Sequence, residues 1–130
     1  MNKKILIVED DISMQEELKA LLENTSYGVT VLKDFANAKE IILNSNVDLV
    51  LLDVNIPYLN GELLLKELRK ESNIPVIILT SRASELDEAL SISYGADDFI
   101  TKPYNPTILL LRIQNVFKRL NQIKDKIKYR

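Results

Sequence analysis

Short apolar runs, rich in leucine and β-branched residues, alternate with longer amphipathic segments along this chain. The runs occupy residues 4–8, 29–32, 48–52, 75–79 and 97–101. Runs of this length, bounded by turn residues such as glycine, proline and asparagine, are typical of buried strands. Strands that alternate with helical segments indicate parallel βα units and a sheet covered by helices on both faces. We therefore predict one α/β domain.

The segments between the runs carry apolar residues at helical spacing, so each is predicted to bury one face against the sheet. Asn60 and Ser84 are suitable N-caps for two of these helices. The last stripe continues almost to the C-terminus, which predicts a long final helix. The predicted apolar faces are Leu18, Leu21 and Leu22; Ala38, Ile41 and Ile42; Leu64, Leu65 and Leu68; Leu86, Ala89, Leu90 and Ile92; and Leu109, Ile113, Val116, Phe117, Leu120, Ile123 and Ile127.

Length and composition support a single domain. The chain has 130 residues, of which 46% are hydrophobic, enough for one core. We place the domain at residues 1–120 and treat 121–130 as a polar, basic helix extension or the start of a linker. No run approaches the ~18 apolar residues of a membrane span, and the N-terminus lacks the features of a secretory signal. A cytoplasmic protein without a membrane partner is therefore expected.

The residue types that are absent narrow the possible chemistry. The chain has no cysteine, which excludes disulfides and thiolate sites. It also has no histidine, which removes the usual general base and the commonest metal ligand. Any metal site must therefore use oxygen ligands.

Charge is unevenly distributed although the net charge is only −2. Residues 118–130 contain six basic residues and one acid, which leaves a charge of −7 on the rest of the chain. The basic segment lacks interleaved aromatic residues, apart from Tyr129, and any nucleic-acid recognition motif. We predict no direct nucleic-acid binding by this chain.

Polar side chains follow three of the predicted strands. Glu9, Asp10 and Asp11 follow the first run, Asp53 follows the third, and Lys102 follows the fifth. Because the carboxyl ends of parallel strands lie at one edge of a sheet, these side chains are expected to meet. Neighbouring carboxylates raise one another's pKa unless a cation sits among them. A divalent cation, a nucleophilic aspartate and a lysine that neutralises an incoming anion would together explain the pattern.

Magnesium is the cation that fits best, with manganese as an alternative, because it prefers oxygen ligands and is usually held by one or two carboxylates. Simpler interpretations remain open at this point. The acids after the first run are also suited to capping the next helix, and Asp11 is the most suitable of them for that role. Asp53 alone is equally compatible with a solvated acid that forms a turn with Asn55 and Pro57.

Four motifs occur in order along the chain: IVEDD, LLDVNIP, LTS and DDFITKP. In residues 3–120 the chain resembles the CheY-like receiver domains of two-component response regulators. The resemblance implies a (βα)5 doubly wound, five-stranded parallel sheet with strand order 2-1-3-4-5. It also implies a phosphoacceptor that is not an enzyme, apart from magnesium-dependent self-phosphorylation and self-dephosphorylation. A partner sensor histidine kinase would supply the phosphoryl group, since this chain has no histidine.

The resemblance assigns roles to individual residues. Asp53 corresponds to the phosphoacceptor, and nucleophilic attack by an aspartate carboxylate is established chemistry. Lys102 and Thr80 would contact the phosphoryl group, and the bond between Lys102 and Pro103 would be cis. The remaining implied roles are metal binding by Asp10, Asp53, the main-chain carbonyl of Asn55 and, through water, Glu9; switching by Thr80 and Phe99; and control of phosphoryl lifetime by Asn55 and Arg82.

The motif GADDFITKP and the basic last helix resemble the OmpR/PhoB subfamily, whose receivers dimerise through the fourth helix, fifth strand and fifth helix. Glu88 and Leu90 stand where this subfamily usually has basic residues, and Ile108 where it often has an acid. The apolar pair Leu90 and Ile108 would thus replace one surface ion pair, which is worth only ~0–1 kcal/mol. The implied dimer face comprises Ala89, Leu90, Ile92, Asp97, Asp98, Ile108, Leu110 and Arg112.

The implied output is control of transcription through a DNA-binding domain outside these residues, or alternatively protein–protein contact by a stand-alone regulator. Other functions exist on the same topology. A flavin- or nucleotide-binding protein is disfavoured because the chain has only three glycines and no glycine-rich phosphate-binding motif. A metal-dependent phosphatase often has a second acid two residues after its nucleophile, where this chain has Asn55. An interaction module without phosphorylation is disfavoured because every residue of the acceptor site is intact.

Overall fold

The computed structural model describes residues 2–81 and 94–128, with side chains of the last helix up to Ile123. Each predicted strand is present and differs from the prediction by one residue at most. The helix predicted around Leu86, Ala89, Leu90 and Ile92 lies outside the described residues. The elements are β1 (Lys4–Val8), α1 (Ile12–Asn24), β2 (Gly28–Val31), a 3-10 turn (Phe35–Asn37), α2 (Ala38–Leu43), β3 (Leu49–Asp53), α3 (Gly61–Arg69), β4 (Val76–Thr80), β5 (Asp98–Thr101) and α5 (Pro106–Lys128).

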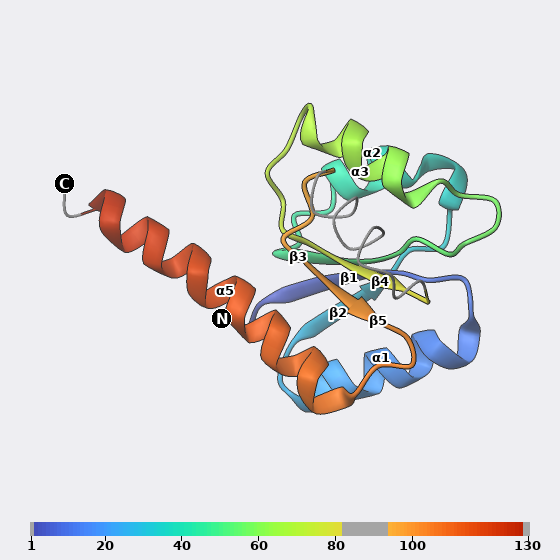
Figure 1. Cartoon of the computed structure of the whole chain (residues 1–130), viewed down its shortest axis with the longest axis horizontal. Helices are drawn as coiled ribbons and strands as arrows, with labels where there is room; N and C mark the ends of the chain where they lie inside the picture. Colours follow the sequence, from blue (N-terminus) through green and yellow to red (C-terminus); the bar gives the residue numbers. More distant parts are fainter. Residues whose placement is uncertain (1, 82–93, 129–130) are drawn as a thin grey trace.

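The strands form one parallel sheet in the order β2-β1-β3-β4-β5 (Figure 1). This confirms the predicted fold class and strand order. The register pairs Val8 with Leu52 and Asp53 with Leu79. Because the strands are parallel and closely in register, the residues that follow β1, β3, β4 and β5 emerge at the same edge of the sheet.

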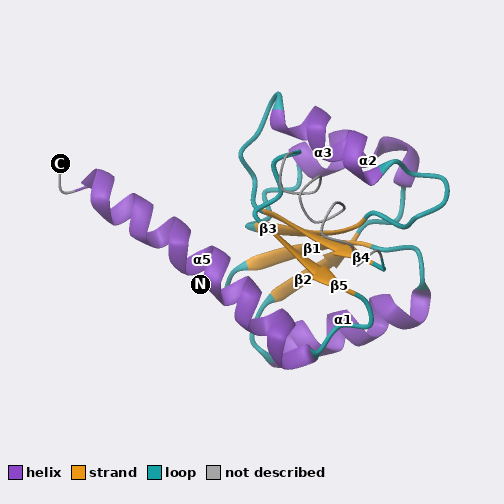
Figure 2. Cartoon of the chain, viewed as in Figure 1, coloured by secondary structure: helices purple, strands orange, loops and turns teal. Residues whose placement is uncertain are grey.

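Helices cover both faces of the sheet (Figure 2), and an apolar layer lies on each face. Side chains alternate along β1: Ile5 and Ile7 pack with α1 and α5, whereas Leu6 and Val8 pack with α2 and α3. All four residues are at most 1% exposed. Burial on both faces explains why the strands are almost continuously apolar in sequence.

Two helices, α1 and α3, begin where capping side chains were predicted. Asp11 Oδ1 accepts a hydrogen bond from the Met14 N–H at 3.1 Å, and Asn60 Oδ1 accepts one from the Leu63 N–H at 3.0 Å. The other predicted cap, Ser84, lies outside the described residues. Asp11 therefore starts α1 directly after the acidic residues that follow β1, which fixes the short connection between strand and helix.

The last helix, α5, extends beyond the sheet (Figure 1). Its first half packs on the sheet through Leu109, Ile113 and Val116. Residues 121–128 continue it as helix. Among the described residues, no helix has the length and apolar character that crossing a membrane requires.

Candidate functional site

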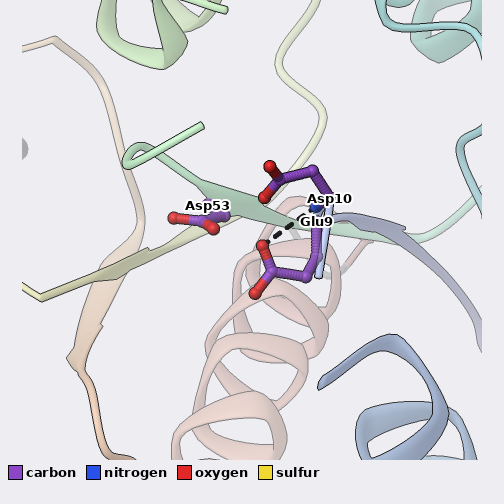
Figure 3. Close-up of side chains that lie close together, drawn as sticks. All are labelled: Glu9, Asp10 and Asp53. Atoms are coloured by element: carbon purple, nitrogen blue, oxygen red, sulfur yellow. Dashed lines mark hydrogen bonds between the residues drawn. The ribbon is translucent and has the colours of Figure 1, made fainter. Parts of the chain in front are cut away.

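Acidic side chains from two neighbouring strands converge at the carboxyl edge of the sheet. Asp53 is the last residue of β3, and Glu9 and Asp10 follow the adjacent β1. One carboxylate oxygen from each of the three residues lies within 4.8 Å of the others (Figure 3). Glu9 is 1% exposed and Asp53 is 2% exposed, whereas Asp10 is only half-buried. The site is thus a small acidic cluster that reaches the surface at Asp10.

Lys102 brings a positive charge to this cluster from the end of β5. Its Nζ lies 2.8 Å from Asp53 Oδ2 and 3.3 Å from Glu9 Oε1. The Lys102–Pro103 peptide bond is cis, which is the geometry that the resemblance implies. The contact with Asp53 joins two residues that the sequence placed at the same edge. The contact with Glu9 was not predicted, because the sequence does not reveal how far the lysine reaches.

The two buried acids, Glu9 and Asp53, differ in pKa and therefore in charge. Burial raises the pKa of Glu9 to about 8, and the hydrogen bond and negative charge of Asp53 add to that rise. Burial also acts to raise the pKa of Asp53, but hydrogen bonds from Glu9, Lys102 and the Asn55 N–H outweigh it and hold that pKa below its ordinary value. Burial opposes the charge on Lys102, yet the two acids raise its pKa overall. Without a metal, Glu9 therefore holds a proton at neutral pH while Asp53 is ionised beside a charged lysine.

Asn55 links Asp53 to the end of β4. The main-chain N–H of Asn55 donates to Asp53 Oδ1 at 2.8 Å, and its side-chain oxygen accepts from the Ser81 N–H at 2.6 Å. Thr80, the residue before Ser81, ends β4 and is 3% exposed. The bond to Ser81 was not predicted, although an amide side chain two residues past a strand end is a general signal for such a loop contact.

Phe99 and the charged residues of β5 lie on the neighbouring surface. Phe99 is half-buried and packs with the layer that contains α2 and α3. The Arg112 guanidinium lies 5.8 Å from the centre of the Phe99 ring and donates to Asp98 at 2.9 Å. The switch role of Phe99 stays a prediction.

The predicted dimer face is only partly within the described residues. Asp97 accepts hydrogen bonds from Arg69 at 3.2 Å and from the Val76 N–H at 2.8 Å, both within this chain. Ile108 is 48% exposed, and Leu110 is half-buried. The other predicted members, Ala89, Leu90 and Ile92, lie outside the described residues, as does Arg82. The dimer face and the lifetime role of Arg82 therefore stay predictions.

The acidic cluster has the donor set of a hard divalent cation. It offers carboxylate oxygens only, and such oxygens suit magnesium, calcium or manganese rather than zinc or copper. Because Asp10 is half-buried beside two buried acids, a cation bound there would stay in contact with solvent and could keep some of its water. The residues present thus fit the magnesium site that the resemblance implies.

Comparison with known proteins agrees with this geometry. Residues 5–114 match the family described as the response regulator receiver domain. The chain belongs to this family. Among curated relatives, this receiver domain is 41% identical over 115 residues to the aerobic respiration control protein ArcA of Escherichia coli (strain K12). It is 45% identical over 116 residues to the transcriptional regulatory protein CpxR of Klebsiella pneumoniae.

Solved structures give the same result for the fold. The Francisella response regulator 1452 receiver domain has a TM-score of 0.85 and 35% identity, and the match covers 92% of this chain and 99% of that one. The BeF3-activated receiver domain of Klebsiella pneumoniae RstA has a TM-score of 0.80 and 36% identity, over 86% of this chain and 96% of that one.

This receiver domain spans about half of the length of the curated relatives that it matches. The matches cover 88% of this chain but 48% of ArcA, and 89% of this chain but 50% of CpxR.

Proposed function

We propose that this receiver domain accepts a phosphoryl group on Asp53 from a partner histidine kinase in a magnesium-dependent reaction. The observation that carries the proposal is the arrangement at Asp53. An ionised carboxylate lies 2.8 Å from the Lys102 ammonium, beside two further acids that suit a cation. Family membership supports the same function.

The two oxygens of Asp53 have different partners. Oδ1 accepts from the Asn55 N–H and Oδ2 accepts from Lys102, so the carboxylate is held in one orientation. In the transfer, one of its oxygens forms a bond to phosphorus as the bond from phosphorus to the donor histidine nitrogen breaks. That nitrogen leaves with the bonding electrons and is then protonated. The Lys102 ammonium offsets the charge of the phosphoryl oxygens, and such positioning and charge balance are the main sources of catalysis in phosphoryl transfer.

Four groups would hold the cation: the carboxylates of Asp10 and Asp53, the main-chain carbonyl of Asn55 and, through water, Glu9. When bound, magnesium would supply positive charge against the phosphoryl oxygens. Manganese fits the same oxygen ligands. The chain's own chemistry would be limited to its phosphorylation and dephosphorylation, without turnover of other substrates.

We propose that phosphorylation acts through Thr80 and Phe99 on the surface formed by the fourth helix, β5 and α5. The relative CpxR is named a transcriptional regulatory protein, which favours control of transcription through a domain outside this chain. The domain would form a homodimer through the same surface and would be located in the cytoplasm. The alternative output is protein–protein contact by the receiver domain alone.

Intact mass spectrometry after incubation with acetyl phosphate and magnesium tests the acceptor. The native chain should gain the mass of one phosphoryl group, and Asp53→Asn should gain none. Asp48→Asn is a matched control, because Asp48 directly precedes β3 at its opposite end. Equal phosphorylation of the Asp53→Asn variant, or none of the native chain, would reject the assignment. Sustained hydrolysis of external phosphoesters would instead favour a phosphatase.

Two further measurements test the lifetime role of Arg82 and the formation of a homodimer. The dephosphorylation rate of Arg82→Ala tests the lifetime role, which an unchanged rate would rule out. Analytical ultracentrifugation before and after phosphorylation tests the dimer, and a chain that stays monomeric at high concentration would exclude it.

A further inference from the structure

Gln15 is a buried polar residue of α1 that has no part in the site described above. Its side chain links the first turn of α1 to the acidic residues that follow β1. The amide nitrogen Nε2 donates to the main-chain carbonyl of Glu9, and the residue is 8% exposed. Its other end, Oε1, lies 3.5 Å from Lys33 Nζ. Gln15 thus connects α1 and the residues after β2 to the point where the chain leaves β1.

The surroundings give the Gln15 amide one favoured orientation. The Lys33 ammonium can only donate a hydrogen bond, and the Glu9 carbonyl can only accept one. An amide satisfies both when Oε1 faces Lys33 and Nε2 faces Glu9. At 3.5 Å the contact with Lys33 is long for a hydrogen bond and acts mainly as attraction between a charge and a dipole. A glutamate or a methionine at this position would leave the Glu9 carbonyl without its donor.

The carbonyl that Gln15 holds belongs to the peptide group between Glu9 and Asp10. The N–H of the same peptide group, on Asp10, donates to Glu9 Oε2 at 3.0 Å, and Glu9 Oε1 contacts Lys102 at 3.3 Å. One peptide plane therefore carries contacts that orient both acids. If it rotated, the Glu9 and Asp10 carboxylates would no longer converge on Asp53.

We propose that Gln15, oriented by Lys33, is a positioning residue that fixes this peptide group and thereby aims the Glu9 and Asp10 carboxylates at one cation. The inference rests on the proposed magnesium-dependent function. Groups that orient metal ligands without touching the metal typically change metal affinity by about 10- to 100-fold when removed. A merely structural hydrogen bond would instead lower the stability of the fold and leave the metal affinity of the folded protein unchanged.

Binding of Mn2+ separates these two roles, because electron paramagnetic resonance counts the free ion directly. The proteins to compare are the native chain, Gln15→Met, Lys33→Met and the control Gln114→Met, whose residue is exposed on α5. We expect Gln15→Met to weaken binding by about tenfold or more and the control to leave it unchanged. Lys33→Met should weaken binding by a smaller factor than Gln15→Met, because the amide keeps its donor but loses its orientation.

A phosphorylation assay with acetyl phosphate adds a second readout. If Gln15 acts only by positioning the ligands, Gln15→Met should raise the magnesium concentration for half-maximal rate, while the rate at saturating magnesium stays near that of the native chain. The double variant with Gln15→Arg and Lys33→Glu restores a donor toward Glu9 and a charge pair behind it. It should recover most of the Mn2+ affinity that Gln15→Met loses.

Native Mn2+ affinity in a folded Gln15→Met variant would overturn the proposal, whatever its melting temperature. If Gln15→Met does not fold, Lys33→Met provides the test, because Lys33 is exposed and its substitution should not prevent folding. Unchanged Mn2+ affinity in Lys33→Met would then overturn the proposal. A native chain that binds no Mn2+ would also overturn it. If the native chain binds Mn2+ and Gln15→Met weakens that binding but Asp53 is never phosphorylated, the positioning role stands and the phosphoacceptor function fails.

Discussion

In the absence of metal, the stability of this domain should depend on pH through Glu9, a buried acid of the cluster. Burial raises the pKa of Glu9 to about 8, whereas in an unfolded chain it is about 4.3. The chain has no histidine, the side chain that ordinarily titrates near neutral pH. The pKa of Asp53 is lowered and that of Lys102 is raised, so neither changes its charge near neutral pH.

Between the unfolded and folded pKa values of Glu9, the folded state holds a proton that the unfolded chain has released. The stability that this proton provides is fully present below the unfolded pKa and is lost as the pH rises through about 8. The free energy of unfolding should therefore fall as pH rises. One proton corresponds to at most about 1.4 kcal/mol per pH unit, or at most about 2.8 kcal/mol between about pH 5.5 and 7.5. That is a large share of the ~5–15 kcal/mol typical of a domain.

Urea denaturation in a chelator, followed by circular dichroism across this pH range, measures the effect. The slope should be present in the native chain and absent in Glu9→Gln, which has no proton to release. Glu23→Gln, at an exposed glutamate of α1, should keep the native slope. Saturating magnesium should flatten the native profile, because ligation favours ionised acids.

Two results would refute the reasoning. A native chain whose stability is constant or rises over the range would show that Glu9 is ionised in the metal-free fold. An equal slope in Glu9→Gln would show that a different group takes up the proton.

Three other substitutions test separate features of the structure. Lys102→Met should slow phosphorylation by acetyl phosphate on the order of a hundredfold. It should not weaken Mn2+ binding, because it removes a positive charge that competes with the cation, and weakened Mn2+ binding would contradict this role. Leu65→Ala, on the buried face of α3 at a residue that is 0% exposed, should lower the urea-derived free energy of unfolding by about 2–5 kcal/mol, and a loss below about 1 kcal/mol would show that the layer repacks. Asn60→Ala should lower the same quantity by about 1 kcal/mol and Asn60→Gly by only a few tenths, so equal losses would argue against a capping role.

Burial on both faces made the strands predictable from sequence, but not the residues at which they end. The apolar run before Asp53 marked β3, yet the strand includes Asp53, whose main chain pairs with β4 opposite Leu79. Thr80 likewise belongs to β4. A polar side chain at the end of a strand looks like the beginning of a loop in sequence, because hydropathy reports the side chain and pairing depends on the main chain.

The cluster of acids and Lys102 was predictable in its members and not in all of its contacts. Asp53 and Lys102 are marked by their positions after apolar runs, and parallel topology brings such positions together. No sequence feature distinguishes Gln15, because a glutamine in the first turn of an amphipathic helix is usually exposed to solvent. Arg69 was not predictable either. It and Lys66 are both basic residues of α3, and the sequence does not show that Arg69 is the one that forms an ion pair with Asp97, at 3.2 Å.

The two ends of the connection between β4 and β5 are tethered to different parts of the molecule. Ser81 is held by the side chain of Asn55, beside the acceptor. Gly95 is held from α3, where Arg69 Nε donates to its carbonyl at 2.9 Å. The φ of Gly95 is +100°, and a Cβ atom on this residue would lie only 2.9 Å from Arg69 Cγ, so a larger residue has no space here. We expect a change of charge on Asp53 to reach Ser81 through Asn55, so amide exchange at Ser81 should change while the Arg69–Gly95 hydrogen bond is unaffected.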